Sequence, residues 1–509
     1  MENKVRKSSI GENKEVTRRK FMRDSAMVAA GLGSVIGGCK GKEEEKEPNT
    51  VESDAPKTPE KEEDPQVAKK VDDINVALIG LGVQCERLME AILGKKTDHQ
   101  KGIEGIRFKA VCDIFPYRLK RISGQLKRGY KHDANPYESY EEMLDKEKDL
   151  QAAIIVTPDW LHAPMTIACL EAGLHVYCEK EMSNNLEDAK KMVQTAKRTG
   201  KYLQIGHQRR SNPRYQVAEK LIREHKLLGK VKNINAQWNR SVEKHKVLLP
   251  VNKKIWMDKA ALEQYGYGSM DELKNWRWYK KFGGGPLGDL GSHQIDIFSW
   301  FLGDVKPTSV LASGGNDYYK YEHNENVMAI YEYETEQGSV RAFYQVLNTT
   351  GWGTYGTYYE TFMGDVGTLL IAEYATEKNN GWVFLERYIK ETDDAVLKSA
   401  VLKRWNDCIR KKLIGGEYEM PEEIKDGSIL KIGASIPGRK AFHYHPLLRK
   451  LTKPVHQPHL ENFFDAIRGK AELNCPGEVG YETAVAVLKA NEAIEEGKKL
   501  NFKPEDFKV

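Results

Sequence analysis

Lys180, Asp289 and His293 are the residues of this sequence best suited to proton-transfer chemistry. Lys180 follows the apolar stretch His175–Cys178, where a short buried strand is expected to end. Asp289 and His293 stand four residues apart in DLGSHQIDIFSWFLG, an expected helix, so they should share one face of it. An imidazole can take up a proton near neutral pH, a carboxylate can orient it or bind a neighbouring hydroxyl, and an ammonium can stabilise negative charge on oxygen. Together these residue types indicate chemistry at a hydroxyl group.

Each of the three also has a purely structural interpretation. A lysine at the end of a strand is usually solvated, Asp289 could cap the helix after Gly288, and His293 could be a hydrogen-bonded core histidine. The chemical interpretation therefore depends on whether the fold brings the three side chains together.

The elements that must position Lys180 begin at residues 74–94, where the sequence predicts a strand, a glycine-rich turn and a helix. INVALI is a buried-strand pattern, and helical periodicity follows it. In Gly80-x-Gly82-x-x-Cys85, the first glycine permits a tight turn and the second lets backbone amides approach a pyrophosphate, while the helix beginning at Val83 adds partial positive charge. This arrangement is typical of dinucleotide-binding folds, although Cys85 replaces the third glycine.

A second strand, within Phe108–Arg118, ends in Asp113. A carboxylate there can accept hydrogen bonds from the adenosine ribose hydroxyls and repels a 2′-phosphate, which favours NAD; the nearby Arg118 keeps NADP possible. The alternative is that Asp113 is a turn residue or a helix cap.

Strands and helices alternate from residue 74 to about 205, which predicts a parallel sheet covered on both faces. Ligands of such sheets bind beyond the carboxyl ends of the strands. The residues expected at those ends are Gly80, Asp113, Thr157, Lys180 and His207.

Several motifs, in their order and spacing, resemble those of the Gfo/Idh/MocA (glucose–fructose oxidoreductase / inositol dehydrogenase) family. They are Gly80-x-Gly82, Thr157-Pro158-x-x-x-His162, Ala172-Gly173-x-His175-Val176, Glu179-Lys180 and GGGPLGDLGSHQID at 283–296. The similarity covers about residues 74–370 and resumes at 459–470 and 486–502. Two features depart from the family pattern: Glu181 stands where proline is usual, and residues 373–458 match no part of it.

The resemblance implies an α/β protein with two domains. They are an N-terminal Rossmann NAD(P)-binding domain (74–205) and a C-terminal α/β substrate domain (206–509), built on an open, mainly antiparallel sheet with an insertion around 373–458. The implied reaction is hydride transfer from a hydroxyl of a sugar, glycoside or polyol, with Lys180, Asp289 and His293 as catalytic residues. A homo-oligomer is implied on the same ground.

The resemblance and the local pattern also give two sets of expected contacts. The cofactor-binding residues are Gly80, Gly82, Val83, Asp113, Arg118, Thr157, Pro158, His162, Glu179, Lys180 and His207. The substrate-binding residues are Lys180, Arg240, Trp276, Arg277, Asp289 and His293, with Trp238, Trp278 and Tyr279 as further candidates for an aromatic wall. His162 is expected to position a loop near the cofactor rather than to act as a base.

The first 39 residues carry an export pattern. Thr17–Arg23 (TRRKFMR), a short apolar run and Ile36–Cys39 resemble a twin-arginine signal with a lipoprotein box, in which Cys39 bears the lipid. Residues 40–73 are rich in Glu, Lys and Pro and are expected to form a disordered acidic linker. The prediction is a periplasmic or cell-envelope lipoprotein held at the membrane by its lipid.

Composition limits the other partners. The net charge is +5, but residues 1–38 contain eight Lys or Arg against four Asp or Glu, so the remainder is nearly neutral and nothing indicates nucleic acid. The cysteines other than Cys39 are expected to be buried free thiols, and no spacing indicates a metal site.

Export would limit the reactions that an NAD-dependent enzyme can carry out, because free nicotinamide nucleotides are scarce outside the cytoplasm. A tightly bound NAD that is recycled within each turnover is therefore expected. One alternative is a redox-neutral NAD-dependent glycosidase working through a keto sugar. Another is a lipid-anchored, non-catalytic carbohydrate-binding protein, which Cys85 and Glu181 would favour.

Overall fold

The computed structural model describes residues 73–94, 100–240, 253–316, 318–350, 358–373, 381–419 and 443–509. The predicted signal, Cys39 and almost all of the predicted linker lie outside these residues. Within the described ranges, no helix combines the length and the apolar character needed to cross a membrane.

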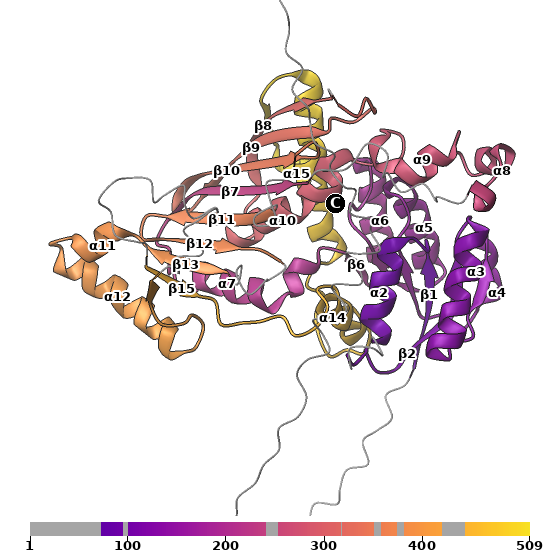
Figure 1. Cartoon of the computed structure of the whole chain (residues 1–509), viewed down its shortest axis with the longest axis horizontal. Coiled ribbons are helices and arrows are strands. Elements are labelled where there is room, and N and C mark those ends of the chain that lie inside the picture. Colours follow the sequence, from indigo (N-terminus) through magenta and orange to yellow (C-terminus); the bar gives the residue numbers. More distant parts are fainter. Residues whose placement is uncertain are drawn as a thin grey trace, which may run out of the picture. The chain divides into compact units, whose positions relative to one another are not determined.

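The N-terminal part is the Rossmann-like parallel sheet that the sequence predicts (Figure 1). Its strand order is β3-β2-β1-β4-β5-β6, and every neighbouring pair is parallel. The strands are β1 (Ile74–Ile79), β2 (Ile106–Cys112), β3 (Asn135–Tyr137), β4 (Ala152–Ile155), β5 (His175–Cys178) and β6 (Leu203–Ile205). Because the order reverses around β1, a crevice for ligands is expected beyond the carboxyl ends of β1 and β4.

Both faces of this sheet are covered, which explains the uninterrupted apolar run of β1. Val76 and Leu78 enter a core shared with α2 and α3, whereas Ala77 and Ile79 enter a second core shared with α5 and α6. These helices are α2 (Val83–Leu93), α3 (Pro116–Gln125), α5 (Asp159–Glu171) and α6 (Leu186–Thr199). The six cysteines of the described residues are all buried and free, as the sequence predicts.

The C-terminal part is an open, mainly antiparallel sheet in the order β14-β15-β13-β12-β11-β7-β10-β9-β8-β16. Only the pair β7–β10 is parallel. The strands are β7 (Val231–Asn239), β8 (Pro307–Gly315), β9 (Asn326–Thr335), β10 (Gly338–Leu347), β11 (Tyr358–Gly364), β12 (Gly367–Ile371), β13 (Trp382–Leu385), β14 (Tyr418–Glu419), β15 (His443–Pro446) and β16 (Leu500–Asn501). The segment 373–458, which the sequence pattern does not explain, thus adds three strands at one end of this sheet, together with α11 (Arg387–Glu391) and α12 (Ala395–Arg410).

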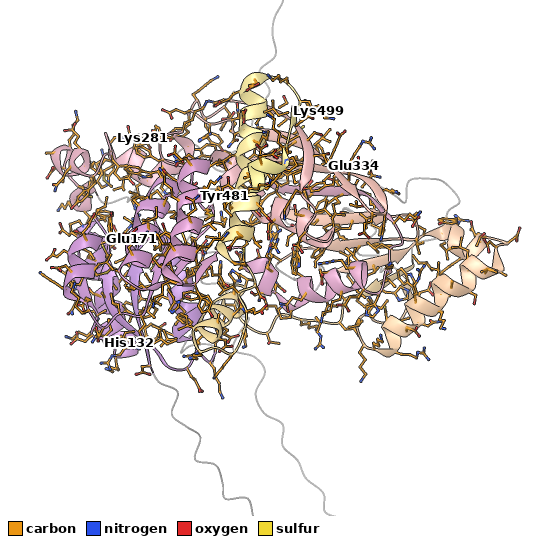
Figure 2. All side chains as sticks on the ribbon, turned by 180° about the vertical axis from the view of Figure 1, so that it is seen from behind. His132, Glu171, Lys281, Glu334, Tyr481 and Lys499 are labelled. Carbon is orange, nitrogen blue, oxygen red and sulfur yellow. The ribbon has the colours of Figure 1, made fainter. Side chains whose placement is uncertain are left out.

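Helices join the two sheets. α15 (Gly477–Glu496) packs against β8 of the second sheet and against α6 of the first, and α10 (Ser292–Phe301) packs against α15, β7 and β10. Charged side chains such as those of Glu171, Lys281 and Lys499 cover the outside (Figure 2). The junction beside α10 is where the residues predicted to do chemistry meet.

Candidate active site

The glycine turn after β1 has the form that a pyrophosphate requires. Gly80 has φ +86°, and a Cβ there would lie 2.7 Å from the backbone of Val156, so only glycine fits. Gly82 is different, because a Cβ there would meet nothing within 4 Å. The space in front of the N-terminus of α2 is therefore open, and the backbone amides that begin at Val83 border it.

Asp113 fastens this turn to the end of β2. Its Oδ2 accepts a hydrogen bond from the Leu81 amide at 2.7 Å, and its Oδ1 accepts one from the Phe115 amide at 2.8 Å. Arg118 adds an ion pair at 3.4 Å. These contacts are those of a turn residue, the alternative that the sequence left open, at a place that borders the adenosine side of the crevice.

His162 connects the end of β4 with the residues after β5. Its ring nitrogens lie 2.7 Å from the carbonyl oxygen of Glu181 and 2.8 Å from that of Thr157. Burial lowers the pKa of His162 to about 4, so the ring is neutral at pH 7 and donates to one of the two oxygens. This is the geometry of a residue that positions a loop. Pro158 precedes the helix that carries His162, and the buried hydroxyl of Thr157 has no partner among the described residues, which leaves it for a ligand.

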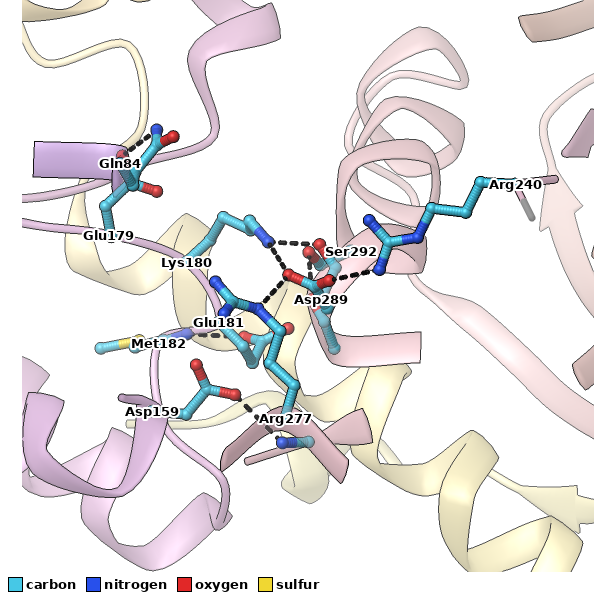
Figure 3. A network of polar contacts seen from close by, with 12 residues as sticks. Gln84, Asp159, Glu179, Lys180, Glu181, Met182, Arg240, Arg277, Asp289 and Ser292 are labelled. Carbon is cyan, nitrogen blue, oxygen red and sulfur yellow. Dashed lines mark hydrogen bonds and ion pairs between the residues drawn. The ribbon is translucent and has the colours of Figure 1, made fainter. Parts of the chain in front are cut away.

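Glu179, at the end of β5, belongs to a polar group that the sequence does not predict in full. Its carboxyl accepts a hydrogen bond from Gln84 at 3.3 Å (Figure 3), and the same amide of Gln84 lies 2.9 Å from Nε2 of His456. Burial raises the pKa of Glu179. His456 escaped prediction because it lies in the segment that matches no family motif.

Lys180 and Asp289 meet at the centre of the site (Figure 3). The Lys180 ammonium donates to the backbone carbonyl of Asp289 and lies 3.6 Å from its carboxylate. Arg277 donates to the same carboxylate at 2.8 Å and Arg240 at 3.1 Å. Burial by itself raises the pKa of Asp289, but Arg277, Lys180 and Arg240 outweigh it and hold the pKa well below its usual range. Asp289 is therefore an ionised carboxylate that forms ion pairs with three cations.

The predicted helix through Asp289 and His293 is present, but its first part is π-helical. Residues Leu287–Gly291 form a π-helical turn, and the regular helix α10 begins only at Ser292. Asp289 does not cap that helix, since its carboxylate binds the three cations instead.

His293 is neutral, and no hydrogen bond joins its ring to the carboxylate of Asp289, which binds the three cations. Its ring packs 5.6 Å from that of Trp238, and its Nδ1 has no hydrogen-bond partner in the part of the chain that the structure describes. Burial is the largest cause that lowers the pKa of His293 well below its usual range, and the nearby charges of Lys180 and Arg209 add to it. The imidazole is therefore neutral at pH 7, which is the form that can accept a proton.

Two residues just after β6 complete the site. His207 is buried, neither of its ring nitrogens has a partner among the described residues, and burial lowers its pKa to about 4. Arg209, which sequence reasoning missed, is buried in an ion pair with Glu360 and lies 3.7 Å from Glu373. The signal for it was GHQRR directly after a buried strand, where two arginines would be costly unless paired.

Glu181 and Asp159 form a buried acidic pair near Lys180 (Figure 3); the sequence marked Glu181 only as a departure from the family pattern and did not single out Asp159. The peptide bond between Lys180 and Glu181 is cis. The Glu181 carboxyl accepts from the Met182 amide at 2.8 Å, while its other oxygen has no partner among the described residues. Burial, together with Asp159, raises the pKa of Glu181 to about 8, and burial raises that of Asp159 to about 6. At neutral pH the Glu181 carboxyl is therefore mostly protonated.

Two of the predicted aromatic wall residues border the site, and a third lies in the core. Trp238 stacks on Tyr358 at 4.9 Å and faces His293, and Trp276 covers the guanidinium of Arg277 at 4.2 Å, so both border the site. Trp278 is buried and packs against other aromatic rings, as a core residue does. Among the described residues, no group of three or more His, Cys, Asp or Glu side chains is arranged to hold a metal.

Comparison with known proteins decides the family. Two family models match: an oxidoreductase family with an NAD-binding Rossmann fold over residues 74–207, and the C-terminal alpha/beta domain of that family over residues 220–502. The chain belongs to the Gfo/Idh/MocA oxidoreductase family. The sequence-based assignment of fold and family is confirmed, including the NAD-binding Rossmann domain.

Relatives within the family are similar over part of their length. The chain is 26% identical to scyllo-inositol 2-dehydrogenase (NADP(+)) of Bacillus subtilis over 230 residues, which are 45% of this chain and 51% of that one. It is 32% identical to a glycosyl hydrolase family 109 protein of Shewanella baltica over 139 residues, 26% of this chain and 28% of that one. The chain therefore spans about half or less of the length of these relatives.

Solved structures share the fold over nearly their whole length. A levoglucosan dehydrogenase in complex with NADH has a TM-score of 0.59 at 17% identity, covering 85% of this chain and all of that one. The WlbA dehydrogenase of Bordetella pertussis, in complex with NADH and UDP-GlcNAcA, has a TM-score of 0.56 at 17% identity, covering 85% and 99%. At such low identity the likeness concerns the fold.

Proposed function

We propose that this family member is an exported NAD(P)-dependent oxidoreductase that removes hydride from a hydroxyl carbon of a sugar, glycoside or polyol. The observation that carries the proposal is that the Lys180 ammonium binds Asp289, whose helix also carries the neutral His293, beside the nucleotide crevice. Lys180 follows β5, whose carboxyl end borders that crevice, while His293 comes from the second sheet's helix α10. A relative that is an inositol 2-dehydrogenase and a structural neighbour that is a levoglucosan dehydrogenase support this class of substrate.

The side chains divide the work as follows. The bound nicotinamide supplies the hydride acceptor. Lys180 donates a hydrogen bond to the reacting oxygen, since its ammonium has donors beyond the one given to the Asp289 carbonyl. His293, neutral at pH 7, takes the hydroxyl proton on its imidazole ring.

Asp289 prepares the site rather than reacting. With its charge it holds Lys180, Arg240 and Arg277 together, which like-charge repulsion would otherwise separate. The two arginines then present further N–H donors to the neighbouring hydroxyls of a sugar.

The cofactor residues fit a dinucleotide. The open space at Gly82 admits a pyrophosphate to the amides of α2, and the unpartnered hydroxyl of Thr157 and the buried carboxyl of Glu179 border the same crevice.

We further propose that the nucleotide is held tightly and recycled, because TRRKFMR and the box ending in Cys39 support export of a folded, loaded protein. Acid denaturation of the purified protein should then release close to one nicotinamide nucleotide per chain, measured by chromatography. Loss of all nucleotide on simple gel filtration would contradict tight retention.

A second function, redox-neutral glycoside cleavage, is favoured by the relatives named as glycosyl hydrolase family 109 proteins. The two functions differ in one readout. With a panel of glycosides and polyols, a dehydrogenase accumulates the absorbance of reduced nicotinamide in proportion to product. A redox-neutral enzyme releases the aglycone while that absorbance stays flat.

Lys180→Met tests whether Lys180 is the residue that donates a hydrogen bond to the reacting oxygen. It should abolish turnover and spare nucleotide content, because Lys180 binds the substrate side of the site. Lys191→Met, on an exposed lysine of α6 paired with Glu187, is the matched control and should keep both. Unchanged turnover in the Lys180 variant removes this residue from the mechanism.

A further inference from the structure

A small apolar core brings a lysine from the second part of the chain to the adenosine side of the crevice. The segment 259–283, which contains α8 (Lys259–Gln264) and α9 (Met270–Asn275), packs its buried side chains against Phe115, two residues after Asp113. Lys274 on α9 is carried there by this core, since its neighbour Leu273 is part of it.

Two cations meet at the ring of Phe115. The Lys274 ammonium lies 5.3 Å from the ring centroid, and the Arg118 guanidinium lies 5.5 Å from the same centroid. Arg118 is ion-paired with Asp113 at 3.4 Å, whereas Lys274 is half-buried and makes no hydrogen bond or ion pair that joins it to a described residue. One carboxylate thus faces two positive charges.

The carboxylate of Asp113 is already hydrogen-bonded. Both oxygens of Asp113 accept hydrogen bonds from backbone amides, one from Leu81 and one from Phe115. Its negative charge is therefore compensated locally, and it no longer opposes a second anion as an unpaired aspartate would.

We propose that Lys274 and Arg118 form a phosphate-binding site at the adenosine end of the crevice, so that the protein binds NADP at least as tightly as NAD. The position at the end of β2 is where the adenosine ribose lies in this fold, and a 2′-phosphate supplies a second anion to two cations that share the single carboxylate of Asp113. The inference rests on the proposed nicotinamide-nucleotide function and names the nucleotide that it uses.

The electrostatics of Lys274 agree with this geometry. Burial first, and then the charge of Arg118, lower the pKa of Lys274 to about 8. A phosphate placed between the two cations reverses both effects, because it restores a polar partner and screens their repulsion.

A competition experiment tests the inference on the purified protein. The protein is incubated with equal concentrations of NAD and NADP until the bound ratio stops changing, isolated by gel filtration and denatured, and the released nucleotides are quantified. The wild type should carry NADP and NAD in a ratio of one or more, and Lys274→Met should lower that ratio about tenfold by removing one of two charges on the phosphate. The ratio of the wild type should also fall as salt is raised.

Two further variants keep the test decisive. Lys281→Met, on an exposed lysine of the same segment whose ammonium instead donates to the Gly266 carbonyl at 2.8 Å, should keep the wild-type ratio (Figure 2). Arg118→Met should lower the ratio as Lys274→Met does, and it decides the matter if the lysine variant fails to fold. A wild-type ratio below one, or an unchanged ratio in the variants that lose a cation, overturns the inference alone. Binding of neither nucleotide overturns the proposed function with it.

Discussion

The buried carboxyl of Glu181 makes the stability of this protein depend on pH in a direction opposite to that of most carboxylates. Glu181→Gln replaces the carboxyl by a group of the same shape that cannot ionise. The folded protein raises the pKa of Glu181 from 4.5 to about 8, chiefly by burial. A tenfold change in proton affinity is worth about 1.4 kcal/mol, so the rise corresponds to about 5 kcal/mol.

The sign follows from which state holds the proton more strongly. Below about pH 4.5 the carboxyl is protonated in both the folded and the unfolded chain, and its contribution to stability is fully present. As pH rises toward 8 and beyond, the unfolded chain releases the proton first, and the wild type loses up to about 5 kcal/mol of its free energy of unfolding. The glutamine variant has no such loss.

The assay is urea denaturation of both proteins at pH 5, 7 and 9, followed by tryptophan fluorescence and repeated as apparent melting temperatures. Titration of groups distant from Glu181 cancels in the difference between the two proteins at each pH. Relative to the wild type, Glu181→Gln should gain stability steadily as pH rises. Glu171→Gln, on an exposed glutamate paired with Arg198, is the matched control and should show a difference that hardly changes with pH. Parallel stability curves for wild type and Glu181→Gln from pH 5 to 9 would refute the argument, since the carboxyl would then titrate as it does in water.

The two glycines of the nucleotide turn should respond oppositely to alanine. Gly82→Ala should keep the melting temperature of the wild type and lose nucleotide content, because the methyl group enters the open space that the pyrophosphate would occupy. Gly80→Ala should lose about 1–3 kcal/mol of stability, because its Cβ would lie 2.7 Å from the Val156 backbone at a φ of +86°. Equal melting temperatures for both variants would contradict this. Glu360→Gln should destabilise the fold by about 3–5 kcal/mol in urea, because it leaves the buried Arg209 without its main counter-charge, and an unchanged urea midpoint would mean that the ion pair is not needed.

Much of the nucleotide half could be predicted from local pattern. Strand β1, the glycine turn and helix α2 can each be recognised from residues adjacent in the sequence. The parallel sheet and the crevice then followed from strand order and the rules of this fold. The edge strand β3 was missed, because its three residues are too few to show alternation. The added strands of the second sheet were missed because their pairing is set by distant partners.

The candidate site was predicted as a set of residue types and only partly as an arrangement. Lys180, Asp289, Arg240 and Arg277 were all named from the sequence, yet the pattern paired Asp289 with His293, whereas the structure pairs it with the three cations. The three cations come from residues 12 to 109 positions away along the chain, and four-residue spacing carries no information about such distant partners.

The sequence by itself determined the family, the glycine turn and the identity of the reactive side chains, because these are expressed by residues within a few positions of one another. Only the tertiary structure decided their charge states and partners. Those depend on burial and on side chains more than a hundred residues away, such as Asp289 for Lys180 and Lys274 for the ring of Phe115. An electrostatic environment is a property of the folded neighbourhood, and no local pattern records it.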